Sequence, residues 1–156
     1  MIAIIDYGVG NLFSLKSSLA AIGREAVVTG DRAVLRAASH VILPGVGAFG
    51  DAAARLRAAG MAEAVLEAAA AGKPVLGICL GMQLLLERSF EYGEHPGLGL
   101  IPGEVRPIRD VIPAGLAVPH MGWNALRFPA ERPRSPIFAA LEEGEHVYFV
   151  HSYAGF

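Results

Sequence analysis

The sequence holds only one cysteine, Cys79, among its 156 residues, so it cannot form an internal disulfide bond. Chains of this kind are typical of reducing compartments, and we expect a cytoplasmic protein. Long hydrophobic runs are also missing, because every apolar stretch is well short of the roughly 18 residues that a membrane span needs. The first residues form neither a basic segment nor a cleavage site, so no secretory signal is predicted.

The chain has no marked excess of charge of either sign. Its 13 lysines and arginines stand against 15 aspartates and glutamates, which gives a formal net charge of −2. This balance offers no electrostatic basis for binding nucleic acid. Hydrophobic residues make up 53% of the sequence, which argues against disorder, and the length fits one domain with a single core.

Two kinds of apolar pattern alternate along the first half of the chain. Short buried runs predict strands at 1–6, 25–30, 38–45 and 74–79, and helical spacing predicts helices at 11–23, 50–72 (with a break near Gly60) and 80–90. From Gly93 onward Gly and Pro become frequent, and the alternation over 146–156 is typical of an exposed or antiparallel strand. We therefore predict an α/β fold with a mostly parallel sheet flanked by helices and an antiparallel, β-rich second half.

Glycine-rich segments follow three of the predicted strands. They are "DYGVGN" (6–11), "PGVGAFG" (44–50) and "GICLG" (77–81). One such segment would be explained by a turn alone. Because the carboxyl ends of parallel strands meet at one edge of a sheet, three of them together predict a functional site there.

Cys79 lies between Gly77 and Gly81, where a predicted strand changes into a predicted helix. This G-x-C-x-G pattern is typical of a nucleophile elbow, in which flanking glycines remove side chains that would clash at a strained turn. The helix that follows would favour the reactive thiolate. A lone cysteine in an apolar strand is also compatible with a small buried hydrophobic residue, but the paired glycines favour a nucleophile.

A nucleophile of this type needs donors for a developing oxyanion. The backbone N–H of Leu80 is one expected donor. The segment "LPGVGAFG" would supply another from Val46 or Gly47, since its glycines let the backbone come close. The alternative for that segment is a plain Pro-Gly turn.

Several segments of the chain resemble the class I, or triad, glutamine amidotransferases. They span nearly all of the sequence and are "IIDYGVGNLFSL" (4–15), "LPGVGAFG" (43–50), "GICLGMQLLLERSFE" (77–91), "GLGLIPGEV" (97–105), "PHMGWN" (119–124) and "YFVHSY" (148–153). The pattern GxCxGxQ is common to the broad superfamily. DYGxGN together with PHMGWN is much more specific, and is similar to the glutaminase subunits of histidine biosynthesis.

The resemblance implies a flavodoxin-like fold and the hydrolysis of glutamine to glutamate through a cysteinyl thioester. The ammonia would pass to a cyclase subunit with a (β/α)8 barrel, which makes imidazole glycerol phosphate and aminoimidazole carboxamide ribotide. The two subunits would form a heterodimer. Neither a cofactor nor a metal is implied.

The resemblance also assigns roles by position. Cys79 is the nucleophile, and the other residues are Gly45, Val46 and Gly47 in the oxyanion strand, Gln83 and Glu91 on the substrate's polar groups, Ser152 and Tyr153 at the pocket, and Asn11, His120, Met121, Trp123 and Asn124 at the partner interface and ammonia path. From the residues alone, Gln83 and Glu91 are also compatible with solvated helix positions. Trp123 is likewise compatible with a core tryptophan.

The family's triad is completed by a His-x-Glu pair beyond "HSY", and the sequence contains no such pair. None of its five histidines matches by position: His40, His95, His120, His146 and His151. We therefore expect residues 1–156 to form a single glutamine amidotransferase domain without its C-terminal segment, as a fragment or as a truncated product. The alternatives to a working glutaminase are an inactive, partner-binding chain and another triad amidotransferase or cysteine hydrolase.

Overall fold

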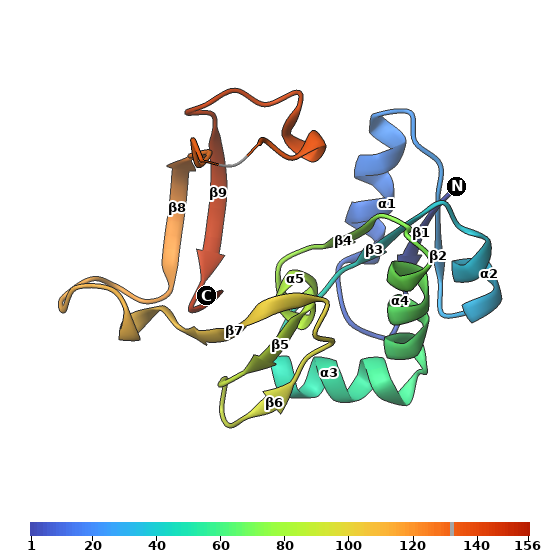
Figure 1. Cartoon of the computed structure of the whole chain (residues 1–156), viewed down its shortest axis with the longest axis horizontal. Coiled ribbons are helices and arrows are strands. Elements are labelled where there is room, and N and C mark those ends of the chain that lie inside the picture. The colour runs from blue at the N-terminus through green and yellow to red at the C-terminus, as the bar shows by residue number, and fades with distance from the viewer. Residues whose placement is uncertain (132) are drawn as a thin grey trace. The chain divides into compact units, whose positions relative to one another are not determined.

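The computed structural model describes residues 1–131 and 133–156 and contains two compact units (Figure 1). The first unit comprises Met1–Arg106 and Ala154–Phe156, and the second comprises Pro107–Tyr153. No helix in the described residues is long and apolar enough to cross a membrane.

The first unit contains a sheet of parallel strands, which are β1 (Ile2–Ile5), β2 (Ala26–Thr29), β3 (His40–Leu43) and β4 (Val75–Gly77). They lie in the order β2-β1-β3-β4, so β1 and β3 are central (Figure 1). Ile4 of β1 is in register with Val28 of β2 and Ile42 of β3, and residues 3–5 and 41–43 of the two central strands are buried. This confirms the predicted α/β architecture with a mostly parallel sheet.

The helices of the first unit are α1 (Leu12–Ala21), α2 (Arg32–Ala37), α3 (Phe49–Ala58), α4 (Met61–Ala70) and α5 (Leu80–Leu84). Gly60 separates α3 from α4 with a left-handed backbone (φ 68°), at the predicted break. Phe49 and Leu56 of α3 and Val65 of α4 are buried in the core. In contrast, α1 has no buried residue, and Phe13 is 82% exposed.

Two predictions for the chain around Cys79 are wrong. The helix expected over 80–90 ends at Leu84, and Leu86–Ser89 forms a strand, β5. Three consecutive leucines are compatible with a helix or a strand. Residues 86–89 form a strand because they pair with a segment that begins at Ile101. The strand at 74–79 is also less buried than expected, because β4 is an edge strand and Leu76 is 38% exposed.

A second sheet contains β5 together with β6 (His95–Pro96), β7 (Ile101–Pro107) and β10 (Tyr153–Gly155). The order is β10-β7-β5-β6, with β5 antiparallel to β6 and parallel to β7. The backbone groups of Glu104 and Phe156 exchange two hydrogen bonds of 2.9 Å.

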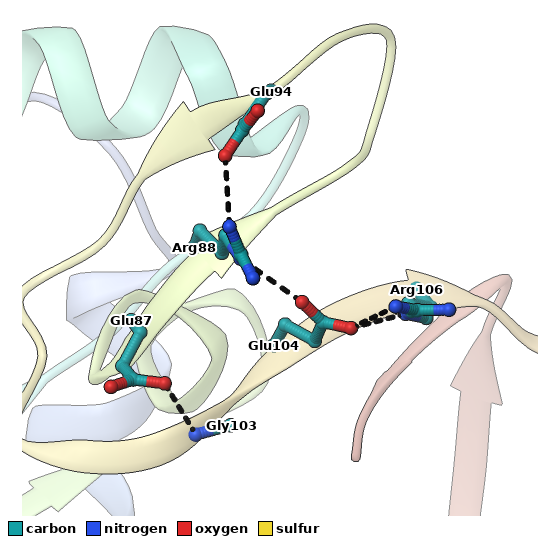
Figure 2. Close-up of polar contacts among 6 residues, drawn as sticks. All are labelled: Glu87, Arg88, Glu94, Gly103, Glu104 and Arg106. Carbon is teal, nitrogen blue, oxygen red and sulfur yellow. Dashed lines mark hydrogen bonds and ion pairs between the residues drawn. The ribbon is translucent and has the colours of Figure 1, made fainter.

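Charged side chains connect the strands of this second sheet (Figure 2). Arg88 donates to Glu104 Oε2 (3.0 Å) and to Glu94 Oε1 (3.2 Å), and Arg106 donates to the other oxygen of Glu104. The hydrogen bonds from Arg106 and Arg88 lower the pKa of Glu104. Both guanidinium groups also lie over the ring of Phe90, at 5.4 and 5.5 Å from its centroid. The network joins β5, β7 and the residue just before β6, and its two arginines share the ring of Phe90.

The second unit is organised around an antiparallel pair, β8 (His120–Ala125) and β9 (His146–His151), with Trp123 opposite Tyr148. This confirms the antiparallel prediction for the second half of the chain. Two short 3-10 helices, Ile108–Asp110 and Pro136–Phe138, lie outside the pair.

Candidate active site

Cys79 has the backbone geometry of a nucleophile elbow. It follows β4, immediately precedes α5, and has φ 55° and ψ −119°. Positive φ is uncommon for residues other than glycine, and such strain clusters at active sites. The side chain is exposed, so the alternative of a small buried hydrophobic residue is wrong.

Three glycines allow close main-chain packing within the elbow and between the elbow and the end of β3. A Cβ on Gly81 would lie 1.9 Å from the carbonyl oxygen of Leu43, and a Cβ on Gly77 would lie 2.4 Å from Cα of Met82. On the opposite side, a Cβ on Gly45 would lie 2.6 Å from the backbone nitrogen of Gly81. These positions therefore require glycine because main-chain atoms occupy the space, and the paired glycines of the motif have a physical reason.

The predicted oxyanion strand lies beside this elbow. Gly45 is in close contact with Leu80 and Gly81, while Val46 is 55% exposed and Gly47 has φ 90° with open space around its Cα. Leu80 is the first residue of α5, and an N–H at that position has no partner inside the helix. The backbone N–H groups of Leu80 and of the oxyanion strand therefore belong to segments that lie beside the elbow.

A buried tyrosine that sequence reasoning missed holds the start of the oxyanion strand. The hydroxyl of Tyr7 donates a 2.8 Å hydrogen bond to the carbonyl oxygen of Pro44. Burial raises the pKa of Tyr7 to about 12, so the donor stays protonated at neutral pH. Tyr7 lies in the segment "DYGVGN", and its position at the end of a predicted strand was the available signal.

Tyr7→Phe is expected to lower the free energy of unfolding at pH 7 by about 1 kcal/mol, because a buried hydrogen bond is lost. An unfolded tyrosine ionises near pH 10, whereas folded Tyr7 holds its proton to about pH 12. Between those values the unfolded state binds fewer protons, so wild-type stability falls as the pH rises. Urea titrations from pH 7 to 11 measure both effects. In the phenylalanine variant the free energy of unfolding should decrease less at alkaline pH than in the wild type. Equal pH profiles would contradict the raised pKa of Tyr7.

Gln83 and Glu91, the predicted substrate-binding residues, occupy different kinds of structure. Gln83 lies in α5, and its N–H donates to the carbonyl oxygen of Cys79 at 3.2 Å. Glu91 lies beyond the end of β5, so its alternative as a solvated helix residue is wrong. Its carboxylate accepts a 2.6 Å hydrogen bond from the N–H of Phe49, at the start of α3. Sequence reasoning did not foresee this contact between Phe49 and Glu91.

Ser152 and Tyr153 belong to the second unit. The carbonyl oxygen of Ser152 accepts from the N–H of Ile108 at 2.9 Å, and the carbonyl oxygen of Tyr153 lies 3.0 Å from Nδ1 of His151. Their place at the glutamine pocket stays a prediction.

The residues predicted at the partner interface do not belong to a core. Trp123 is 68% exposed and Met121 is 61% exposed, so the alternative of a core tryptophan is wrong. The ring of Trp123 meets that of Tyr148 edge-on, with centroids 5.6 Å apart. His120 Nε2 and Asn124 Oδ1 form a 2.8 Å hydrogen bond.

Asn11, the remaining predicted interface residue, lies in the first unit. Its side chain accepts from the N–H of Ser14 at 3.2 Å and caps α1.

Within residues 1–131 and 133–156, no group of three or more His, Cys, Asp or Glu side chains is arranged to hold a metal ion. In the same residues, the histidine ring hydrogen bonds join His40 to Ser39, His120 to Asn124 and His151 to Tyr153. None of these bonds reaches Cys79.

Comparison with known proteins identifies the family of this chain. The family model "Glutamine amidotransferase class-I" matches residues 3–155. A solved structure described as "Crystal structure of glutamine amidotransferase" superimposes with a TM-score of 0.70 at 19% identity, over 96% of this chain and 71% of that one, and supports the fold. The chain belongs to the class-I glutamine amidotransferase family.

Relatives of higher identity place the chain within that family. It is 53% identical over 154 residues to imidazole glycerol phosphate synthase subunit HisH of Sulfurimonas denitrificans, which covers 98% of this chain and 72% of the relative. It is 49% identical over 151 residues to the HisH subunit of Aquifex aeolicus, over 96% of this chain and 70% of the relative. Among the class-I amidotransferases, the chain is thus similar to the HisH subunits.

Proposed function

We propose that the chain is the glutaminase subunit of an imidazole glycerol phosphate synthase. It hydrolyses glutamine and delivers ammonia to a cyclase subunit for histidine biosynthesis in the cytoplasm. The observation that carries this proposal is the strained, exposed Cys79 between Gly77 and Gly81. About half of the residues are identical to those of HisH subunits, and this similarity supports the choice of synthase.

The reaction begins when the thiolate of Cys79 attacks the side-chain amide carbon of glutamine. The carbonyl electron pair moves to oxygen, and backbone N–H groups of Leu80 and the oxyanion strand stabilise the oxyanion. The electron pair on oxygen re-forms the carbonyl as the carbon–nitrogen bond breaks, and the nitrogen takes up a proton from solvent water and leaves as ammonia. Water attacks the resulting thioester, the carbon–sulfur bond breaks, and glutamate leaves with the thiol regenerated.

Substrate recognition is assigned to side chains near this centre. The carboxylate of Glu91 is suited to the ammonium group of glutamine, and Gln83 to its other polar groups. Gln83 lies in the helix that follows the nucleophile, and its N–H donates to the carbonyl oxygen of Cys79 at 3.2 Å.

The test measures glutamate production from glutamine by the purified protein alone, with a cyclase subunit, and with the cyclase plus its nucleotide substrate. We expect glutamate to form in proportion to imidazole glycerol phosphate in the complete mixture. A cyclase that turns over with ammonium salts but not with glutamine plus this protein would reject the proposal. Complex formation without glutamate release would instead identify a non-catalytic docking subunit.

Trp123→Ala is expected to weaken assembly with the cyclase subunit by about tenfold or more, since exposed tryptophans are common anchors of interfaces. The unfolding free energy should change by only about 0.5 kcal/mol, because the ring is mostly solvent-exposed. Binding titrations and urea unfolding measure the two effects. Ile22→Ala, at a 70% exposed position, is the control that should affect neither. Unfolding of the Trp123 variant would overturn the interface role.

A further inference from the structure

The segment from Pro44 to Phe49, which contains the oxyanion strand, is held at both ends, and Val46 and Gly47 between them are exposed. At its start, the carbonyl oxygen of Pro44 accepts from the buried Tyr7 hydroxyl. At its end, the N–H of Phe49 donates to the carboxylate of Glu91. Between these anchors, a Cβ on Gly47 would meet no atom within 4 Å. The positions of the donors at Val46 and Gly47 therefore depend on these two anchors together with the packing of Gly45 on Gly81.

The anchor at Phe49 comes from a distant part of the chain. The residue before α3 is Ala48, which has no side-chain acceptor and makes no cap hydrogen bond. Glu91, 42 positions after Phe49, supplies the acceptor instead, at 2.6 Å. A local Ser or Asp would serve helix stability equally well, whereas a glutamate from the β5–β6 connection also fixes that connection to the oxyanion strand.

The backbone position of Glu91 is itself fixed by local contacts. Its backbone N–H donates to Oγ of Ser89 at 3.1 Å, and Ser89 is fully buried. A few residues further on, the ring of His95 lies against Gly50, where a Cβ would be within 3.0 Å of three ring atoms. The connection that carries Glu91 is thus packed on the first turn of α3.

The carboxylate of Glu91 has capacity for a second donor. Oε2 accepts from Phe49, and in the described residues Oε1 has no hydrogen-bond partner. One carboxylate accepts several hydrogen bonds at once, so Glu91 can hold Phe49 and a substrate ammonium group together.

We propose that Glu91 is a positioning residue for the oxyanion strand in addition to a contact for the substrate's amino group. This inference rests on the proposed function and deepens it. An ammonium group bound to Oε1 and the Phe49 N–H bound to Oε2 share one rigid group. Binding of an α-amino acid amide therefore fixes the end of the oxyanion strand, and amides without an α-ammonium group do not.

Two substitutions separate the contributions of Glu91. Glu91→Gln keeps a carbonyl oxygen that accepts from Phe49 but removes the charge, so KM for glutamine should rise about tenfold or more while kcat stays within about threefold. Glu91→Ala removes both, so kcat should fall by a further factor of about 10 to 100. Glu63→Gln, at an exposed position in the first turn of α4, removes the same charge elsewhere and is the control.

A readout independent of turnover uses the chloromethyl ketone analogue of glutamine. Its carbonyl develops an oxyanion when Cys79 adds, before sulfur displaces chloride at the neighbouring carbon. Iodoacetamide alkylates the thiolate by direct displacement and needs no oxyanion donors. Intact-mass kinetics should show that Glu91→Ala slows the ketone and leaves iodoacetamide unchanged. Ser89→Ala, which releases only the backbone of Glu91, should act in the same direction and is decisive if Glu91→Ala does not fold.

Equal kcat values for the glutamine and alanine variants, with equal ketone rates, would overturn the positioning role and leave Glu91 as an ammonium contact only. That result requires an active wild type. A wild type that neither hydrolyses glutamine nor reacts with the ketone at Cys79 would reject the proposed function itself. The two failures are therefore distinguishable.

Discussion

Replacing Gly81 with alanine is expected to lower the free energy of unfolding by about 3 kcal/mol or more and to abolish the activity of Cys79. The added methyl group would lie 1.9 Å from the carbonyl oxygen of Leu43, 2.7 Å from its carbonyl carbon and 3.0 Å from that of Pro44. All of these are backbone atoms at the end of a central strand, so they cannot rotate away as a side chain would. Urea unfolding and thiol labelling of Cys79 measure the two effects.

The matched control is Gly23→Ala at the end of α1. Gly23 has φ 71° but open space around its Cα, so alanine there meets strain without a clash. We expect this variant to lose about 1 to 2 kcal/mol and to keep its activity. If Gly81→Ala were no more destabilised than Gly23→Ala, the end of β3 would have to be able to shift, and the elbow would not be closely packed on it.

Cys79→Ala is expected to abolish glutamine hydrolysis, with a decrease in kcat of about 10⁴-fold or more, because no other described group would replace the thiolate. Cyclase binding should remain near normal, since the side chain is exposed and only its sulfur is lost. Glutamate release and a binding titration on the same preparation test both parts.

Cys79→Ser provides the matched comparison, since it keeps a polar atom at the elbow but not a readily ionised one. It should be nearly as inactive as the alanine variant. Retained hydrolysis in either variant would remove Cys79 as the nucleophile, and joint loss of hydrolysis and cyclase binding would point to a damaged fold.

Much of the first unit could be predicted from local patterns. Buried strands that alternate with helices gave the parallel sheet, and the break at Gly60 was visible because a left-handed residue ends one helix and starts the next. The elbow could also be predicted, since Gly77 and Gly81 flank the only cysteine. In each case neighbouring residues carry the whole signal.

Predictions failed where distant contacts decide the structure. The run Leu84–Leu86 fits a helix and a strand equally well, and its pairing partner, β7, lies beyond residue 100. Likewise the hydrogen bond between Phe49 and Glu91 joins residues 42 positions apart, and no local sequence pattern predicts it. The exposure of α1 and of β4 also depends on which surfaces of the sheet the rest of the chain covers.

The contact between the elbow and the end of β3 has a consequence for how the site tolerates sequence change. At Gly45, Gly77 and Gly81 the approach is limited mainly by main-chain atoms, and the N–H of Ile78 bonds the carbonyl of Leu43 at 3.0 Å. Backbone atoms are the same whatever the sequence, so the spacing is insulated from repacking elsewhere in the core. Side chains around the sheet are therefore free to drift over evolutionary time, provided that these three positions stay glycine.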